Sequence, residues 1–123
     1  MIMFKFVIEG ETPAKKNSRI VNTKTGRSFP SKRYSEWHKN AVFQLVHQTR
    51  NIPQINEPCR ISMTFVHGDL RRRDSDNGTS SILDLLTDCG VLKDDNWQIV
   101  QELSVKNSYS KGNPSCEVSI EVL

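Results

Sequence analysis

The sequence predicts a small α+β domain in which two main helices pack on one side of a mixed β-sheet. Segments with apolar residues at every second position predict strands, and two segments with apolar residues every three or four positions predict helices. Their order is strand, hairpin, helix, strand, helix, strand, strand, which is typical of the α+β class. The 123 residues are enough for one hydrophobic core, so residues 1–123 are expected to form a single domain.

The chain opens with a predicted strand and a basic hairpin. Alternating apolar residues predict the strand over residues 2–9, and Gly10 is expected to end it. Residues 22–26 are typical of a turn, with residues 19–21 and 27–29 as the arms of a small hairpin. A protruding basic hairpin can contact a phosphate backbone. The alternative is an edge ribbon whose Lys and Arg residues only keep it soluble.

A long helix is predicted to start after Ser31, its N-cap, and to run to about Arg50. His38 and His47 on this helix are expected to be surface residues rather than metal ligands. The apolar face that is expected to meet the sheet consists of Tyr34, Trp37, Ala41 and Leu45, with Val42 and Val46 beside it.

The second half of the chain predicts three more strands and a helix. Alternation predicts a strand around residues 61–65, a long strand over 97–107 and a last strand over 116–122. Between the first two, a helix is expected over about 76–89, with Gly90 as its C-terminal stop. The long strand is expected to have Ile99, Leu103 and Val105 on one side. The residues expected to face inward in the last strand are Cys116, Val118, Ile120 and Val122.

Charge divides the chain into a basic and an acidic half. Residues 1–60 carry eleven Lys and Arg against four Glu, a net charge of +7, whereas residues 61–123 carry six against ten, a net charge of −4. A basic half attracts phosphates without regard to sequence, although it can also be only a solvated surface. All seven acidic residues from Asp69 to Asp95 are aspartates, whose short side chains favour a metal site.

Several classes of protein are excluded by pattern. The three cysteines are far apart and form no C-x-x-C pair, which argues against a zinc site or a disulfide framework. The apolar start of the chain is short and contains Lys5, and no spanning segment follows. The sequence therefore predicts a reduced, cytoplasmic protein with no membrane partner.

The most informative segments are Arg71–Asn77 and Lys93–Asp95, in which acidic residues stand beside basic ones. Asp74 and Asp76 are two residues apart, so in an extended chain both carboxylates point the same way and can reach one Mg²⁺ ion. If the long strand pairs beside the strand of residues 61–65, Asp95 returns to the same place. Asp84 lies about two helical turns after Asp76, on roughly the same face.

Structural explanations of these aspartates stay open. Asp76 is a natural helix N-cap, Asp74 can form an Asx-turn, and residues 94–96 can be an ordinary loop. A helix N-cap needs only one carboxylate, however, and residues 69–95 contain seven aspartates, so capping does not account for all of them. An EF-hand is excluded, because Gly78 and Leu85 occupy two positions where its loop requires oxygen ligands.

The chain resembles the RusA-type Holliday junction resolvases, small endodeoxyribonucleases common in phages and prophages. The resemblance covers nearly the whole chain and is carried by Gly10-x-x-Pro13-x-Lys15, the helix with Tyr34 and Trp37, Asp74-x-Asp76-Asn77 and Gly90-Val91-x-x-Asp94-Asp95. It implies that Asp74, Asp76 and Asp95 bind Mg²⁺ or Mn²⁺ as the catalytic site. It also implies a homodimer in which each subunit cuts one strand of a four-way DNA junction.

The DNA backbone is expected to contact basic residues, which position a substrate without reading its sequence. These are Lys15, Lys16, Arg19, Lys32, Arg33, Arg71, Arg72 and Arg73. One departure from the family is Ser80, which stands where the family has a lysine four residues after the second Asp of Asp-x-Asp. The main hypothesis is therefore a metal-dependent endonuclease for branched DNA. The alternatives are a catalytically weak or inactive RusA-like DNA-binding module and a protein-interaction domain without nucleic acid.

Overall fold

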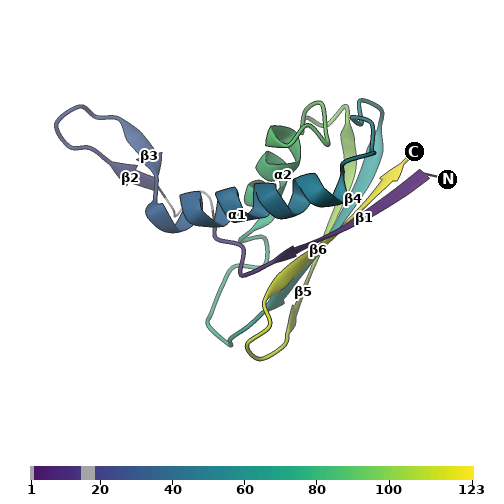
Figure 1. The fold of residues 1–123 in the computed structure, drawn as a ribbon. Helices are drawn as coiled ribbons and strands as arrows, with labels where there is room; N and C mark the ends of the chain where they lie inside the picture. The colour runs from purple at the N-terminus through teal and green to yellow at the C-terminus, as the bar shows by residue number, and fades with distance from the viewer. Residues whose placement is uncertain (1, 15–18) are drawn as a thin grey trace.

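The structure, a computed structural model, describes residues 2–14 and 19–123 and has the predicted α+β architecture (Figure 1). Its elements are β1 (Ile2–Glu9), β2 (Arg19–Val21), β3 (Ser28–Pro30), α1 (Lys32–Gln48), β4 (Cys59–His67), α2 (Thr79–Asp88), β5 (Val100–Tyr109) and β6 (Ser115–Val122). Four strands form one mixed sheet in the order β1-β6-β4-β5, and β2 and β3 form a separate hairpin. Strands β4 and β5 are parallel, and the other neighbours are antiparallel.

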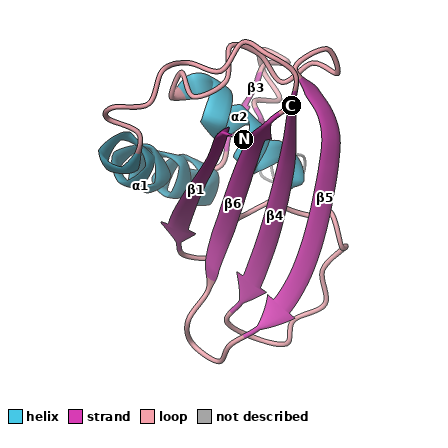
Figure 2. Cartoon of the chain, turned by 90° about the vertical axis from the view of Figure 1, so that its right-hand side faces the viewer, coloured by secondary structure: helices cyan, strands magenta, loops and turns pink. Residues whose placement is uncertain are grey.

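Both helices cover the same face of the sheet, and the core lies between the two layers (Figure 2). Side chains alternate along β4 and β6, so Ile61, Met63 and Val118 are buried under the helices. The apolar face predicted for α1 is confirmed, because Tyr34, Trp37, Ala41 and Leu45 are its buried residues. Ser31 is its N-cap, and the Ser31 hydroxyl accepts a hydrogen bond from the Tyr34 N–H at 3.2 Å.

Helix α2 begins three residues later than the sequence predicts. It starts at Thr79 after the N-cap Gly78, which has no side chain to close the first turn. The carbonyl of Asp76 accepts a hydrogen bond from the Thr79 N–H at 3.1 Å, so Asp76 belongs to the turn before the helix. The structure therefore contradicts the interpretation of Asp76 as the N-cap and leaves its carboxylate exposed.

Strand β5 also starts later than predicted. Residues 96–99 form a turn in which the N–H groups of Ile99 and Val100 donate to the carbonyl of Asn96. Trp97 therefore lies outside the strand and is 75% exposed. Leu103 lies beside the buried Ile61 of β4, but it is 44% exposed because β5 is the edge strand of the sheet.

The two edges of the sheet differ. At β1, the amide of Gln48 bonds the backbone of Val7 in both directions, with distances of 2.9 and 2.7 Å. The Gln44 amide oxygen accepts from the Glu9 N–H at 2.7 Å. Within the described residues, no side chain bonds the outer backbone edge of β5. The end of β1 around Val7 and Glu9 is thus covered from α1, and the outer edge of β5 is open.

The three cysteines are free thiols. Burial raises the pKa of Cys116 to about 12 and also raises the pKa of Cys59, so both stay protonated at neutral pH. None of the helices in the described part of the chain combines the length and the apolar character that a membrane crossing requires.

Candidate functional site

Asp74 and Asp76 lie on the loop that joins β4 to α2, on either side of Ser75. Both side chains are exposed. The loop is fixed to the sheet because the Asn107 amide on β5 donates to the Ser75 carbonyl at 2.8 Å, while Asn107 Oδ1 lies 2.8 Å from His67 Nε2. The Asn77 N–H closes a turn on the Asp74 carbonyl at 3.1 Å. A backbone held in this way presents both carboxylates to solvent at a defined place.

Arg73 holds the first part of the same loop. Its guanidinium lies 3.2 Å from Glu11 Oε1 and 3.0 Å from Asp69 Oδ1, and its side chain is only 12% exposed. Glu11 also pairs with His67 at 2.8 Å, so this carboxylate connects the segment after β1 with the end of β4. The Arg71 N–H, followed by the Arg73 guanidinium, lowers the pKa of Asp69 and keeps it ionised. We conclude that Arg73 positions the loop, and its contact with DNA stays a prediction.

A basic pocket lies beside the aspartates, between the segment after β1 and the loop before α2. Its volume is about 200 Å³, and its lining includes Arg33, Arg71, Arg72, Arg73, Asn77 and Thr12. The Ser81 hydroxyl donates to the Pro13 carbonyl at 2.6 Å, which fastens the segment after β1 to the first turn of α2. Arg33, Arg71 and Arg72 have exposed side chains, and no ion pair links them to another described residue. The pocket therefore carries positive charge that is available to an anion.

The other predicted DNA contacts are distributed more widely. Lys15 and Lys16 fall outside the described residues. Arg19 lies in β2, and the β2–β3 hairpin projects from the body of the domain (Figure 1). Lys32 forms an exposed ion pair with Glu36 at 3.8 Å, an interaction too weak to hold it away from DNA. Ser80 is exposed on the first turn of α2.

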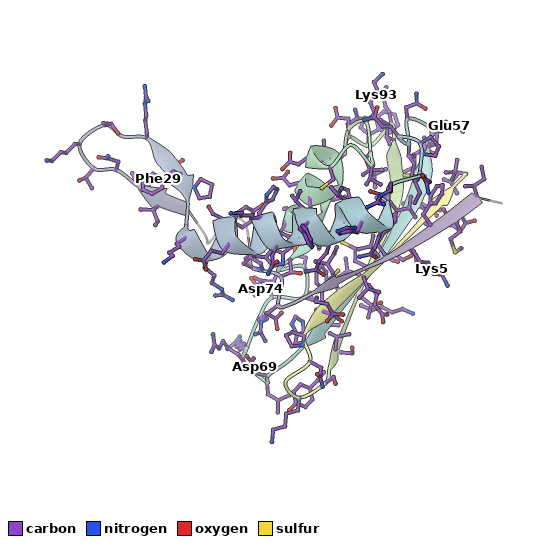
Figure 3. All side chains as sticks on the ribbon, viewed as in Figure 1. Lys5, Phe29, Glu57, Asp69, Asp74 and Lys93 are labelled. Atoms are coloured by element: carbon purple, nitrogen blue, oxygen red, sulfur yellow. The ribbon has the colours of Figure 1, made fainter. Side chains whose placement is uncertain are left out.

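Asp95 lies just before the start of β5, whereas the aspartate loop is attached near the end of that strand. The long strand β5 does pair beside β4, but Asp95 does not return to the aspartate loop. The pair is parallel, so Val100 at the start of β5 lies beside Cys59 at the start of β4. Ser75 is attached to Asn107, seven residues further along β5, or about 23 Å at the usual rise of a strand. Figure 3 shows Asp74 and Lys93, close in sequence to Asp95, on opposite sides of α1.

The surroundings of Asp95 are acidic. Partial burial, a hydrogen bond with Asp94 and the charges of Asp94 and Asp84 raise the pKa of Asp95. Among the described residues, no three His, Cys, Asp or Glu side chains lie close enough together to hold a metal ion. One chain thus brings Asp74 and Asp76 together and leaves Asp95 apart from them, and the role of all three as ligands stays a prediction.

Two residues that support the loop were not predicted. Glu11 follows the first strand and Asn107 lies near the end of β5, and both act through contacts with residues more than thirty positions away. A single sequence carries no signal for such pairs, because each residue looks like an ordinary polar residue at a strand end.

Comparison with known proteins identifies the family. The family model described as "Endodeoxyribonuclease RusA" matches residues 9–121. A curated relative from Aquifex aeolicus (strain VF5), named crossover junction endodeoxyribonuclease RusA, is 27% identical over 108 residues, which are 88% of this chain and 83% of that protein. Residues 9–121 span the aspartate loop, the arginine pocket and the segment of Asp95. The chain therefore belongs to the endodeoxyribonuclease RusA family.

Proposed function

We propose that this protein is a metal-dependent endodeoxyribonuclease that cuts four-way DNA junctions by paired nicks. The observation that carries the proposal is the pair of exposed carboxylates, Asp74 and Asp76, fixed on one loop beside a pocket of arginines. Family membership and the name of the Aquifex relative support the substrate. Since that substrate is cellular DNA, the expected location is the cytoplasm.

Two of the three predicted carboxylate ligands, Asp74 and Asp76, are placed where they could hold a divalent cation. Mg²⁺ is commonly held by one or two carboxylates together with waters and substrate phosphates, and Asp74 with Asp76 meets that description. The third predicted ligand, Asp95, does not join them within one chain. When bound, Mg²⁺ or Mn²⁺ would supply positive charge at the phosphate that is cut. The DNA backbone would be held by three arginines of the pocket, Arg33, Arg71 and Arg72. Arg73 keeps the aspartate loop in place through its ion pair with Glu11.

A synthetic four-way junction with labelled strands tests the proposal. We expect nicks with Mg²⁺ or Mn²⁺, none with EDTA, and much slower cutting of a linear duplex of the same sequence. Cutting that persists in EDTA would remove the metal dependence. Binding of the junction without any nick in either metal would instead favour the alternative, a RusA-like DNA-binding module.

The arginine pocket is expected to dominate the salt dependence of binding. Arg72→Ala and Arg33→Ala should each weaken junction binding and reduce the slope of log K against log salt by about one, because each removes about one phosphate contact. Fluorescence anisotropy at several salt concentrations measures this slope. Arg50→Ala is the matched control, since Arg50 is an exposed arginine at the other end of α1. Equal slopes for Arg72→Ala and Arg50→Ala would place the contacts outside the pocket.

Ser80 favours the alternative of a weak enzyme, because a serine supplies no positive charge. We expect Ser80→Lys to raise the single-turnover rate of cleavage, by up to about 10²-fold where the added charge reaches the reacting phosphate. Position 80 is exposed in the first turn of α2, four residues after Asp76, so a lysine there adds a flexible positive charge to the segment that directly follows the carboxylates. Ser80→Gln is the control for side-chain length. If Ser80→Lys leaves the cleavage rate unchanged and Arg72→Ala lowers it, the positive charge at the reacting phosphate comes from the arginine pocket.

A further inference from the structure

We propose that the β2–β3 hairpin recognises the branch point of the DNA, by packing the apolar side chains of Ile20 and Phe29 against bases that have lost a stacking neighbour there. The inference rests on the proposed function, because it names the part of a branched substrate that the hairpin contacts. It starts from an unexplained feature of the fold: a ribbon that projects from the domain carries large apolar side chains in solvent (Figure 3).

The two side chains form one face of the ribbon. Ile20 in β2 and Phe29 in β3 are directly opposite each other in the antiparallel register, so their side chains point to the same side. Each is 45% exposed, and neither is among the described residues that form the hydrophobic core. Val21, the next residue along β2, lies on the opposite face. Apart from each other, β2 and β3 have no extensive contact with another helix or strand in the described part of the chain.

The end of the ribbon is a hydrogen-bonded turn. The Asn22 N–H donates to the Arg27 carbonyl at 2.8 Å, and the Gly26 N–H donates to the Asn22 carbonyl at 2.8 Å. The Asn22 side-chain oxygen also accepts from the Lys24 N–H at 2.9 Å. Gly26 has a φ of +70°, which a residue with a side chain adopts only with strain. A ribbon closed in this way loses little further conformational entropy when it binds, which favours affinity.

The charge around this face favours a nucleic acid as its occupant. Between Glu11 and Glu36 the sequence has no acidic residue, but it has seven basic ones: Lys15, Lys16, Arg19, Lys24, Arg27, Lys32 and Arg33. An apolar protein surface leaves such charge without partners, whereas DNA offers phosphates to the cations and bases to the apolar side chains. In a linear duplex, neighbouring bases cover the faces of each base. At the branch of a four-way junction this stacking is interrupted, so apolar side chains can pack against a base there.

The hairpin is attached beside the arginine pocket. Phe29 is followed four residues later by Arg33, whose side chain lines that pocket together with Arg71 and Arg72. Four residues of extended chain span at most about 14 Å, and successive nucleotides of one DNA strand are about 3.4 Å apart along the helix axis. A phosphate held in the pocket therefore lies within about four nucleotides of a base that contacts Phe29.

Substitutions on the two faces of the ribbon test the proposal in EDTA, where binding is measured apart from metal-dependent cutting. Anisotropy gives the affinities for a synthetic four-way junction and for a linear duplex of the same sequence. Phe29→Ala is expected to weaken junction binding about 5-fold or more and duplex binding much less, because one base–aromatic stack contributes about 1–3 kcal/mol. Val21→Ala is the matched control and should keep the wild-type ratio of the two affinities. An unchanged ratio in Phe29→Ala, or an equal change in Val21→Ala, overturns the proposal.

The salt dependence separates a contact with bases from a loss of the whole hairpin. Packing against a base releases no counterions, so Phe29→Ala is expected to keep the wild-type slope of log K against log salt. Arg27→Ala, on the same hairpin, should reduce that slope by about one. Phe29→Tyr keeps the aromatic ring and should keep the wild-type affinity. If the slope falls in Phe29→Ala as well, the ribbon has lost its shape in that variant, and crosslinking of the wild type decides instead.

Crosslinking locates the contact in the unaltered protein. Junctions with 5-iodouracil at the branch are expected to form a covalent adduct with Phe29 on irradiation, identified by mass spectrometry of the digested complex. The same base in the middle of an arm should give no adduct with Phe29. Absence of the adduct at every branch position, or an equal yield from the arm, contradicts the proposal.

A second copy of the chain is the competing occupant of this face. If Phe29→Ala changes the sedimentation of the free protein and leaves the preference for junctions intact, the face serves a contact between subunits and the proposal fails. Wild-type protein that binds junctions but does not nick them with Mg²⁺ or Mn²⁺ rejects the proposed function instead. The two affinities and the crosslink then still judge the hairpin, because neither measurement requires cleavage.

Discussion

Replacement of Asp74 or Asp76 by asparagine is expected to abolish strand cleavage while junction binding is retained. Asparagine has nearly the volume of aspartate but no negative charge, so each change removes a ligand for a cation and leaves the loop its shape. Charge stabilisation by a bound metal ion contributes several kcal/mol, and its loss lowers the rate by on the order of 10²-fold or more. Binding is expected to stay or to tighten, because a negative charge near phosphates is removed.

Single-turnover nicking of a labelled junction measures the rate, and anisotropy measures the affinity. Both side chains are exposed, so the melting temperature should not change. Glu57→Gln is the matched control, since it removes an exposed carboxylate before β4, far from the loop (Figure 3). Cleavage by Asp74→Asn at the wild-type rate would show that the site is assigned to the wrong residues.

Substitution of Gly78 by alanine is expected to destabilise the domain and slow cleavage together. A Cβ atom at this position would lie 2.7 Å from Phe65 Cε1 and 2.9 Å from Thr12 Cγ2. The φ angle is −100°, which suits any residue, so the penalty comes from packing alone. Phe65 is only 3% exposed in the core and cannot turn away. Overpacking of this kind costs about 1–3 kcal/mol, and the melting temperature should fall by roughly 5 °C or more.

Thermal unfolding followed by circular dichroism measures the effect. Gly112→Ala is the contrasting variant: its added Cβ meets nothing within 4 Å, but its φ of +72° strains an alanine. It should lose about 1 kcal/mol of stability and keep the wild-type cleavage rate. If Gly78→Ala cuts junctions normally, the packing of Gly78 does not position the aspartate loop.

The parts of the fold that depend on residues close together in the sequence could be predicted from it. The spacing of Tyr34, Trp37, Ala41 and Leu45 defines the buried face of α1, and Ser31 marks its start. The start of α2 could not be predicted, because its N-cap is Gly78, which has no capping side chain, whereas Asp76 is of the residue type that usually caps a helix.

The candidate site also has a part that the sequence predicts and a part that depends on the tertiary fold. Asp74 and Asp76 lie on one loop because they are two residues apart, and this the sequence shows directly. Whether Asp95 joins them depends on the direction of β5, and alternating hydrophobicity is the same for parallel and antiparallel strands. The support of the loop by Glu11 and Asn107 also depends on the tertiary fold.

The glutamines of α1 limit how far this sheet can grow. Gln44 and Gln48 occupy the backbone groups of Val7 and Glu9 that another strand would need, so a strand can be added beside this end of β1 only if both amides are displaced. Two surface side chains thus protect part of an edge strand through amide hydrogen bonds, and this lowers the tendency of the sheet to pair with the edge of another sheet.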